Sequence, residues 1–331
     1  MACDWFCVQQ AVSFGAYCLC VPFYVAFLAA LWRGAAARCS SSGRRTDERL
    51  RASFFTICLS VGLTDLQGAL HQWLLSRPRL LGFAFHFYAR LDPFAAHLLV
   101  SMSFQLIGTQ FLGVVMLSAN RFTAILLPDK HNRRTFRSGA TTLKWLFAVQ
   151  WALPTLVFTV AYTPFADCGF ERAPNSTSVR LVFYSTYSGL VFFALSVFTV
   201  CCCLVTFVFY ALMVARVLTA RSDRLQWVEV RLACSGLVIF MQVSGVLCAA
   251  GLTYTLMELV AGEDFDPAVA AWYYATMDLL CLVNPFVITA LSRPTRGQVV
   301  ELLSCGRYSA QTTTAVVAVT TVVAQPTQNK D

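Results

Sequence analysis

Seven long stretches of the chain carry no charged residue or only one, and this pattern constrains the fold more than any other feature. The five uncharged stretches join Asp4 to Arg33, Asp92 to Arg121, Lys144 to Asp167, Arg180 to Arg216 and Arg231 to Glu258. The other two contain one acid each, Asp65 and Asp278. A membrane-spanning helix needs about 20 predominantly apolar residues, and each of the seven stretches is long enough.

The composition agrees with a membrane protein. Of the 331 residues, 57% are hydrophobic and only 13% are charged, whereas soluble domains carry about 25% charged residues. The hydrocarbon core cannot satisfy free backbone polar groups, and the apolar stretches lack the alternation of barrel strands, so they are expected to be helices. The sequence predicts an all-α membrane protein, a seven-transmembrane helix bundle over residues 1–306, followed by a disordered cytoplasmic tail over 307–331. The expected spans are about 11–32, 52–75, 94–120, 143–163, 181–213, 232–257 and 268–291.

The positions of lysine and arginine predict the orientation in the membrane. Twenty of the 25 lie in the first, third and fifth connections and in the tail; the other five are Arg77, Arg79, Arg90, Arg172 and Arg180. The basic side is expected to be cytoplasmic, which places the N-terminus outside and the C-terminus inside. Asn175-Ser176-Thr177 is a glycosylation sequon in a connection that this topology places outside. The net charge of +8 follows from the same asymmetry, so no nucleic-acid partner is expected.

Features of catalysis are missing from the sequence. The four histidines stand apart, with no carboxylate at metal-ligand spacing, and neither a Gly-x-Ser-x-Gly elbow nor a phosphate-binding glycine loop occurs. The chain is therefore expected to be no enzyme and to hold neither a cofactor nor a metal centre.

Two acids are expected inside the hydrocarbon, where a carboxylate must face the bundle interior and have partners. Asp65 is either a hydrogen-bonded structural acid or part of a polar network with Asn284 that can bind sodium. Asp278, which lies nearer the outside, is either structural in the same sense or lines a ligand cavity.

Three motifs stand in helices two, three and seven of the expected bundle. They are Asp65, then Asn120-Arg121-Phe122 at the cytoplasmic end of the third helix, and Asn284-Pro285 near the end of the seventh. An arginine such as Arg121 can simply extend to the lipid headgroups. Together, however, the three motifs resemble the landmarks of G-protein-coupled receptors. This resemblance implies that five residues serve activation and coupling: Asp65, Asn120, Arg121, Asn284 and Pro285.

A closer resemblance is to the nematode serpentine chemoreceptors of the Srg superfamily (the gamma, u, v and x types). It rests on Asn120–Ile125 with Pro128 and His131, on Pro22-Phe23-Tyr24, and on Asn284-Pro285 followed by Ser292-Arg293-Pro294. The resemblance implies a chemosensory receptor in the plasma membrane, in sensory neurons and their cilia, coupled to a heterotrimeric G protein. It further implies a small-molecule ligand bound between the helices, for which the expected wall positions are Ser103, Phe104, Ile107, Tyr274 and Asp278.

Several residues depart from the wider receptor pattern. Asn120 replaces the acid before the arginine, so the local ion pair that would restrain Arg121 is missing. The outer end of the third helix has no cysteine, so Cys168 is expected to pair with Cys3 or Cys7 if it forms a disulfide. Cys305 follows the seventh helix, where palmitoylation is a second expectation.

Two other classes of membrane protein remain open alternatives. Seven helices with an external N-terminus also fit a small-solute transporter, although the chain lacks the repeated three-helix unit of such transporters. A ligand-gated channel fits seven helices with the opposite orientation. The orientation of the termini therefore discriminates between the receptor and the channel.

Overall fold

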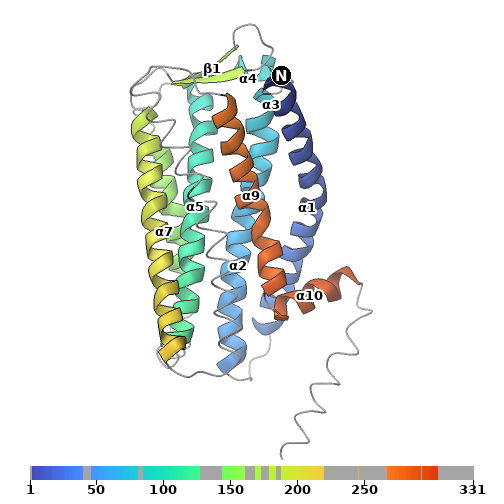
Figure 1. The fold of residues 1–331 in the computed structure, drawn as a ribbon, viewed down its shortest axis with the longest axis vertical. Helices are drawn as coiled ribbons and strands as arrows, with labels where there is room; N and C mark the ends of the chain where they lie inside the picture. The colour runs from blue at the N-terminus through green and yellow to red at the C-terminus, as the bar shows by residue number, and fades with distance from the viewer. Residues whose placement is uncertain are drawn as a thin grey trace, which may run out of the picture.

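Long helices lie side by side along one axis and form a bundle in the computed structural model (Figure 1). The structure describes residues 2–39, 46–80, 85–126, 144–160, 168–172, 179–183, 188–219, 245, 267–291 and 293–304. The long helices are α1 (Ala2–Cys39), α2 (Thr46–His71), α5 (Pro93–Leu126), α7 (Ser188–Thr219) and α9 (Pro267–Leu291). Residues 144–154 are also helical and continue into a π-helical segment, η2 (Thr155–Val160). The span predicted over 232–257 and the tail predicted over 307–331 lie outside the described residues, apart from residue 245.

The two ends of the bundle differ. The N-terminus, α3 (Arg77–Leu80), α4 (Phe85–Tyr88) and strand β1 (Cys168–Arg172) lie at one end, here called the N-terminal end (Figure 1). At the opposite end, α10 (Arg293–Leu303) turns away from the bundle axis directly after α9 (Figure 1). A helix with this direction can lie along the surface of a membrane that the bundle crosses.

A two-stranded hairpin corrects the expectation of a purely helical chain. Strands β1 (Cys168–Arg172) and β2 (Val179–Phe183) pair antiparallel, with Cys168 opposite Phe183 and Arg172 opposite Val179. The helix predicted over 181–213 therefore begins later, at Ser188. The uncharged stretch after Arg180 was assigned to a helix because of its apolar composition alone, but its first residues complete the backbone hydrogen bonds of β1.

The bundle has an apolar outside, and polar side chains are buried among the apolar residues of its interior. Leu19 (79% exposed), Leu204 and Phe207 lie on its surface, whereas Asp65, Gln110 and Gln150 are buried. A soluble monomer avoids such large exposed apolar patches, and lipid favours them. Three described helical segments, Gln10–Arg33, Pro93–Thr123 and Phe193–Arg216, are long and apolar enough to cross a membrane.

Glycines allow close contact between α5 and the helix at 144–160. A Cβ atom on Gly108 would lie 2.9 Å from the Phe158 ring, and one on Gly113 would lie 2.8 Å from the Gln150 amide nitrogen. Small residues bring helix backbones together in this way inside membranes. The close approach buries Phe158 in an apolar cluster that contains Phe104, Ile107 and Phe111 of α5, Leu195 of α7 and Met277 of α9.

A π-helical turn sets the direction of one charged side chain. The second helix continues from α2 through η1 (Gln72–Ser76) into α3, which begins at Arg77. Arg77 follows Asp65 by twelve residues, which in a regular α-helix is about a third of a turn more than three full turns. A single π turn absorbs one extra residue, so Arg77 returns to the face of Asp65. Both side chains are buried, Asp65 at 0% and Arg77 at 1% exposed.

This phasing predicts that deleting one residue from the π turn is tolerated. Deleting Leu74, which is 66% exposed, should remove the extra residue of η1 and leave Asp65 and Arg77 on one face, with only the bond that Pro78 cannot donate missing from the helix. We expect surface expression to stay within about twofold of the unmodified chain, because the helix phase is kept on both sides. Deleting Leu63, which is 49% exposed in regular α-helix, is the matched control. It should rotate one part of the helix by about 100° and abolish expression. Equal loss of expression from both deletions would contradict this account of η1.

Candidate functional site

Asp65 lies at the centre of a buried polar cluster that joins four helices. Its Oδ2 atom accepts hydrogen bonds from the Tyr24 hydroxyl of α1 (2.6 Å) and from Nδ2 of Asn284 of α9 (2.8 Å). Its Oδ1 atom accepts a hydrogen bond from Nε2 of Gln110 of α5 (2.5 Å). Asp65 itself is on α2, so one carboxylate holds α1, α5 and α9 around it. We call these four residues the Asp65 cluster.

Gln150 connects a further helix to the Asp65 cluster. It is fully buried and accepts a hydrogen bond from the Ser60 hydroxyl of α2 at Oε1 (2.9 Å). Its Nε2 atom donates to the backbone carbonyl of Thr109 on α5 (3.3 Å), one residue before Gln110. The helix at 144–154 is therefore linked by side-chain hydrogen bonds to the same two helices that supply Asp65 and Gln110.

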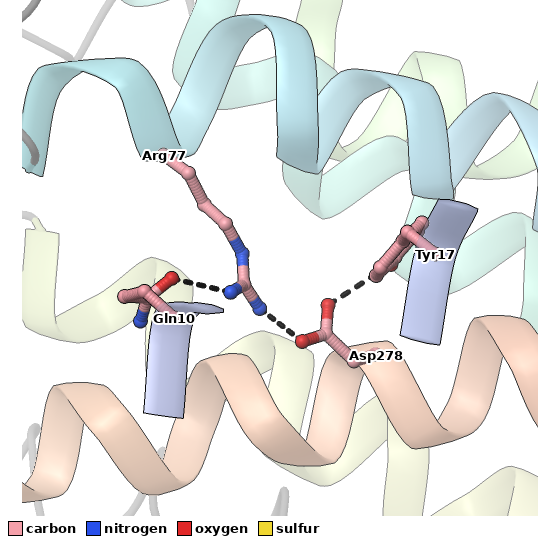
Figure 2. Close-up of polar contacts among 4 residues, drawn as sticks. All are labelled: Gln10, Tyr17, Arg77 and Asp278. Atoms are coloured by element: carbon pink, nitrogen blue, oxygen red, sulfur yellow. Dashed lines mark hydrogen bonds and ion pairs between the residues drawn. The ribbon is translucent and has the colours of Figure 1, made fainter. Parts of the chain in front are cut away.

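Asp278 forms a second buried cluster, nearer the N-terminal end, and Figure 2 shows its four residues. The Arg77 guanidinium forms an ion pair with Oδ2 of Asp278 and donates a second hydrogen bond to Oε1 of Gln10. Oδ1 of Asp278 accepts a hydrogen bond from the Tyr17 hydroxyl (2.9 Å). We call Gln10, Tyr17, Arg77 and Asp278 the Arg77 cluster; it joins α1, α3 and α9. The guanidinium also lies over the Trp73 ring, 4.4 Å from its centroid.

The predicted ligand-wall residues have different surroundings. Ser103 is within hydrogen-bonding distance of Nε2 of His71 (2.7 Å), while Phe104 and Ile107 pack in the apolar cluster with Phe158. Asp278 points toward Arg77 and Tyr17 (Figure 2), and nothing is described for the side chain of Tyr274. These residues remain a predicted wall. A surface depression of about 460 Å³ at His86, Phe87, Arg90 and Leu91 involves none of them.

Arg121 lies near the opposite end of α5 from the N-terminal end. Its guanidinium carbon is 5.4 Å from the centroid of the Phe54 ring on α2. The next residue, Phe122, contacts Phe209 of α7 with ring centroids 5.0 Å apart. The Asn120–Phe122 motif thus lies where α2, α5 and α7 meet.

Some predicted sites fall outside the described part of the chain. They are Asn175, Cys305 and the side chains of Cys3 and Cys7. Cys168 is buried at the start of β1, and its pairing with Cys3 or Cys7 stays a prediction. No group of three or more His, Cys, Asp or Glu side chains suited to a metal ion occurs among the described residues.

Several residues of the two clusters, and Gln150 beside them, received no site role from the sequence; Tyr24 was quoted only as part of the Pro22-Phe23-Tyr24 motif. Tyr24, Gln110 and Gln150 are polar residues within apolar spans, and this position is the signal that identifies them. Arg77 was assigned to an outer connection, because a charge at the end of an apolar stretch normally marks the end of the span. The π turn and the acid on α9 explain why this arginine is buried instead.

A helical bundle with an apolar surface and buried carboxylates defines a polytopic membrane protein, and its motifs are those of a seven-helix receptor. Comparison with known proteins gives the family. The chain matches the serpentine type 7TM GPCR chemoreceptor family Srv over residues 14–305, and it belongs to that family. It is 26% identical over 277 residues to "Serpentine receptor class V-1" of Caenorhabditis elegans. The matched region covers 78% of this chain and 82% of that relative.

Membership of this family confirms the resemblance to the Srg superfamily and narrows it to the v type. The family is one of chemoreceptors rather than enzymes.

The geometry of the Asp65 cluster predicts a large effect of removing its carboxylate. Asp65→Leu leaves the donors of Tyr24, Gln110 and Asn284 buried without their acceptor, at a cost of about 1–3 kcal/mol for each donor. We expect a clear fall in the melting temperature of the purified protein in detergent. Glu301→Leu, which replaces an exposed carboxylate, is the control and should change it little.

A second substitution tests whether this loss arises from the hydrogen bonds. Tyr24→Phe should lower the melting temperature in the unmodified chain and have little effect beside Asp65→Leu, because its hydroxyl then has no acceptor to lose. Equal effects in the two backgrounds would show that Tyr24 does not stabilise the bundle through Asp65.

Proposed function

We propose that this protein is a chemosensory receptor of the plasma membrane that binds a small molecule from outside and activates a heterotrimeric G protein. Its N-terminus is outside and its C-terminus is cytoplasmic, and in the animal it acts in the cilia of sensory neurons. The observation that carries the proposal is the Asp65 cluster, in which one carboxylate holds donors from three other helices. A receptor needs a bundle with two alternative packings, and a shared polar acceptor in its core can be satisfied in more than one of them.

The ligand site lies in the half of the bundle toward the N-terminal end. Its wall includes Ser103, Phe104 and Ile107 of α5 with Tyr274 and Asp278 of α9. Phe104, Ile107 and the Tyr274 ring give this wall apolar surface, and Ser103 and Asp278 give it a few polar groups, which suits a small molecule that is itself mostly apolar. A ligand changes the signal only by the difference between its affinities for the two packings.

Coupling takes place at the opposite end. There Arg121 and the basic connections that follow α5 and α7 face the cytosol. Asn284 and Pro285 transmit the change along α9. Asn284 bonds to Asp65, and Pro285, the next residue, interrupts the regular hydrogen bonding of the helix. In the signalling packing, this end opens and exposes Arg121 to the G protein.

The orientation of the chain in intact cells is the first test. We expect a tag at the N-terminus to bind antibody without permeabilisation, a tag at the C-terminus to need permeabilisation, and Asn175→Gln to remove a glycan-dependent shift in mobility. Arg121 then faces the cytosol, and Arg121→Ala should reduce ligand-dependent G-protein activation at least about tenfold. An internal N-terminus would place Arg121 outside, where no G protein reaches it. That result would reject the proposal in favour of a ligand-gated channel.

Replacing Asn120 tests the restraint on Arg121. An uncharged asparagine cannot form an ion pair with the arginine that follows it, so we expect measurable basal signalling. Asn120→Asp should lower that signal several-fold at equal surface abundance, because the new carboxylate restrains the arginine. Asn120→Ser is the uncharged control. Basal signalling that is the same in all three proteins would contradict the role given to this position.

A further inference from the structure

The Arg77 cluster is a buried charged assembly outside the landmarks that the family resemblance supplies. Arg77 is 1% exposed, and its partner Asp278 is also buried. Charges in the hydrocarbon region are costly and are kept where they serve a function. Removing one partner of such a pair leaves the other charge uncompensated, which is strongly destabilising. The cluster therefore fixes the relative positions of α1, α3 and α9 at this depth of the bundle.

A special backbone feature supports this arrangement. Arg77 reaches the interior only because η1 absorbs one residue, and π turns of this kind are uncommon and often accompany functional sites. The carbonyl of Leu75, inside η1, accepts a hydrogen bond from the Tyr88 hydroxyl. The Tyr88 ring in turn contacts the Phe170 ring of β1, with centroids 5.1 Å apart. Tyr88 thus connects the hairpin at the N-terminal end to the turn that positions Arg77.

The Arg77 and Asp65 clusters share α9. Asp278 belongs to the first and Asn284 to the second, and six residues of α-helix separate them by about 9 Å. The helical segment between them is apolar, and Cys281 at its middle is fully buried. Pro285 follows immediately and has no N–H to donate to the carbonyl of Cys281, so the turn that joins Asp278 to Asn284 is the weakened part of the helix.

We infer that the Arg77–Asp278 ion pair is a latch that holds α9 in the resting packing, and that its release raises basal signalling. The hairpin and Tyr88 set the latch through η1. When the pair separates, the segment 278–284 shifts and changes the contact between Asn284 and Asp65. The effect on signalling rests on the proposed function, whereas the movement of α9 is independent of it.

Labelling of buried cysteines measures that movement directly. Cys281 on α9 and Cys58 on α2 are both fully buried, and mass spectrometry of full-length receptor in membranes can follow each one with a permeant maleimide. In Arg77→Gln and in Asp278→Asn, we expect Cys281 to react at least about tenfold faster, with Cys58 unchanged. General unfolding would accelerate both cysteines. Arg90→Gln, which removes an exposed arginine at the same end, is the control and should change neither.

The pair itself is tested by combining substitutions. The double variant of Arg77→Gln with Asp278→Asn should label Cys281 no faster than the faster single variant, because the interaction is already lost in each. Exchanging the charges, with Arg77→Asp and Asp278→Arg, should return the rate to within about threefold of the unmodified chain. Unchanged Cys281 labelling in both single variants, additive effects, or equal acceleration of Cys58 would each overturn the latch.

Basal signalling per receptor at the cell surface is the second readout. We expect it to rise about threefold or more in both single variants and to fall back in the charge exchange. Faster Cys281 labelling with unchanged basal signal, in a receptor that responds through Arg121, would overturn the regulatory role of the latch. If no protein of the series activates a G protein, the proposed coupling fails, and Cys281 labelling alone decides whether the pair holds α9.

Discussion

A carboxylate buried among apolar helices must find hydrogen-bond donors, and in this protein that requirement organises the bundle. Asp65 has no exposed surface and obtains its donors from α1, α5 and α9. Each donor must therefore lie at the same depth and on the inward face of its own helix. Hydrophobic burial gives little preference among helix rotations inside lipid, because the surroundings are as apolar as the core. The polar contacts supply that preference.

Much of the fold could be predicted because lipid imposes a simple rule on charge. The spacing of charged residues gave the positions of most helices, since spans must be long and apolar. A polar network of Asp65 with Asn284 was one of two alternatives for this acid, and a hydrogen bond of 2.8 Å from Asn284 Nδ2 to Asp65 Oδ2 joins the two side chains. Their role in activation remains a proposal. The rule fails where backbone pairing or an ion pair competes with it, as in the first residues of the stretch after Arg180 and at Arg77.

Arg77 shows why some residues of the site could not be found from the sequence. Its position depends on the π turn at Gln72–Ser76, which changes the helical phase by one residue. Pro78 follows Arg77 directly, but a proline marks an irregular helical turn without showing which side chain the turn moves inward. Its partner Asp278 is about 200 residues away in the chain, and only the packing of α1, α3 and α9 brings the two together (Figure 2). The periodicity of a sequence is a local property. It identifies Asp278 as an acid within an apolar span, but it does not show that Arg77 is its counter-ion.

The two clusters place opposite demands on α9. The Arg77 cluster holds it by a charged pair with little tolerance for displacement, because separation exposes two charges to the hydrocarbon. The Asp65 cluster holds it by an amide on an acceptor that has other donors, so the loss of one bond leaves the carboxylate partly satisfied. On α9 a strong contact thus stands next to a replaceable one, and Pro285 weakens the helical turn between them. In the receptor proposed above, this arrangement is the route by which release of the Arg77–Asp278 pair reaches the Asp65 cluster.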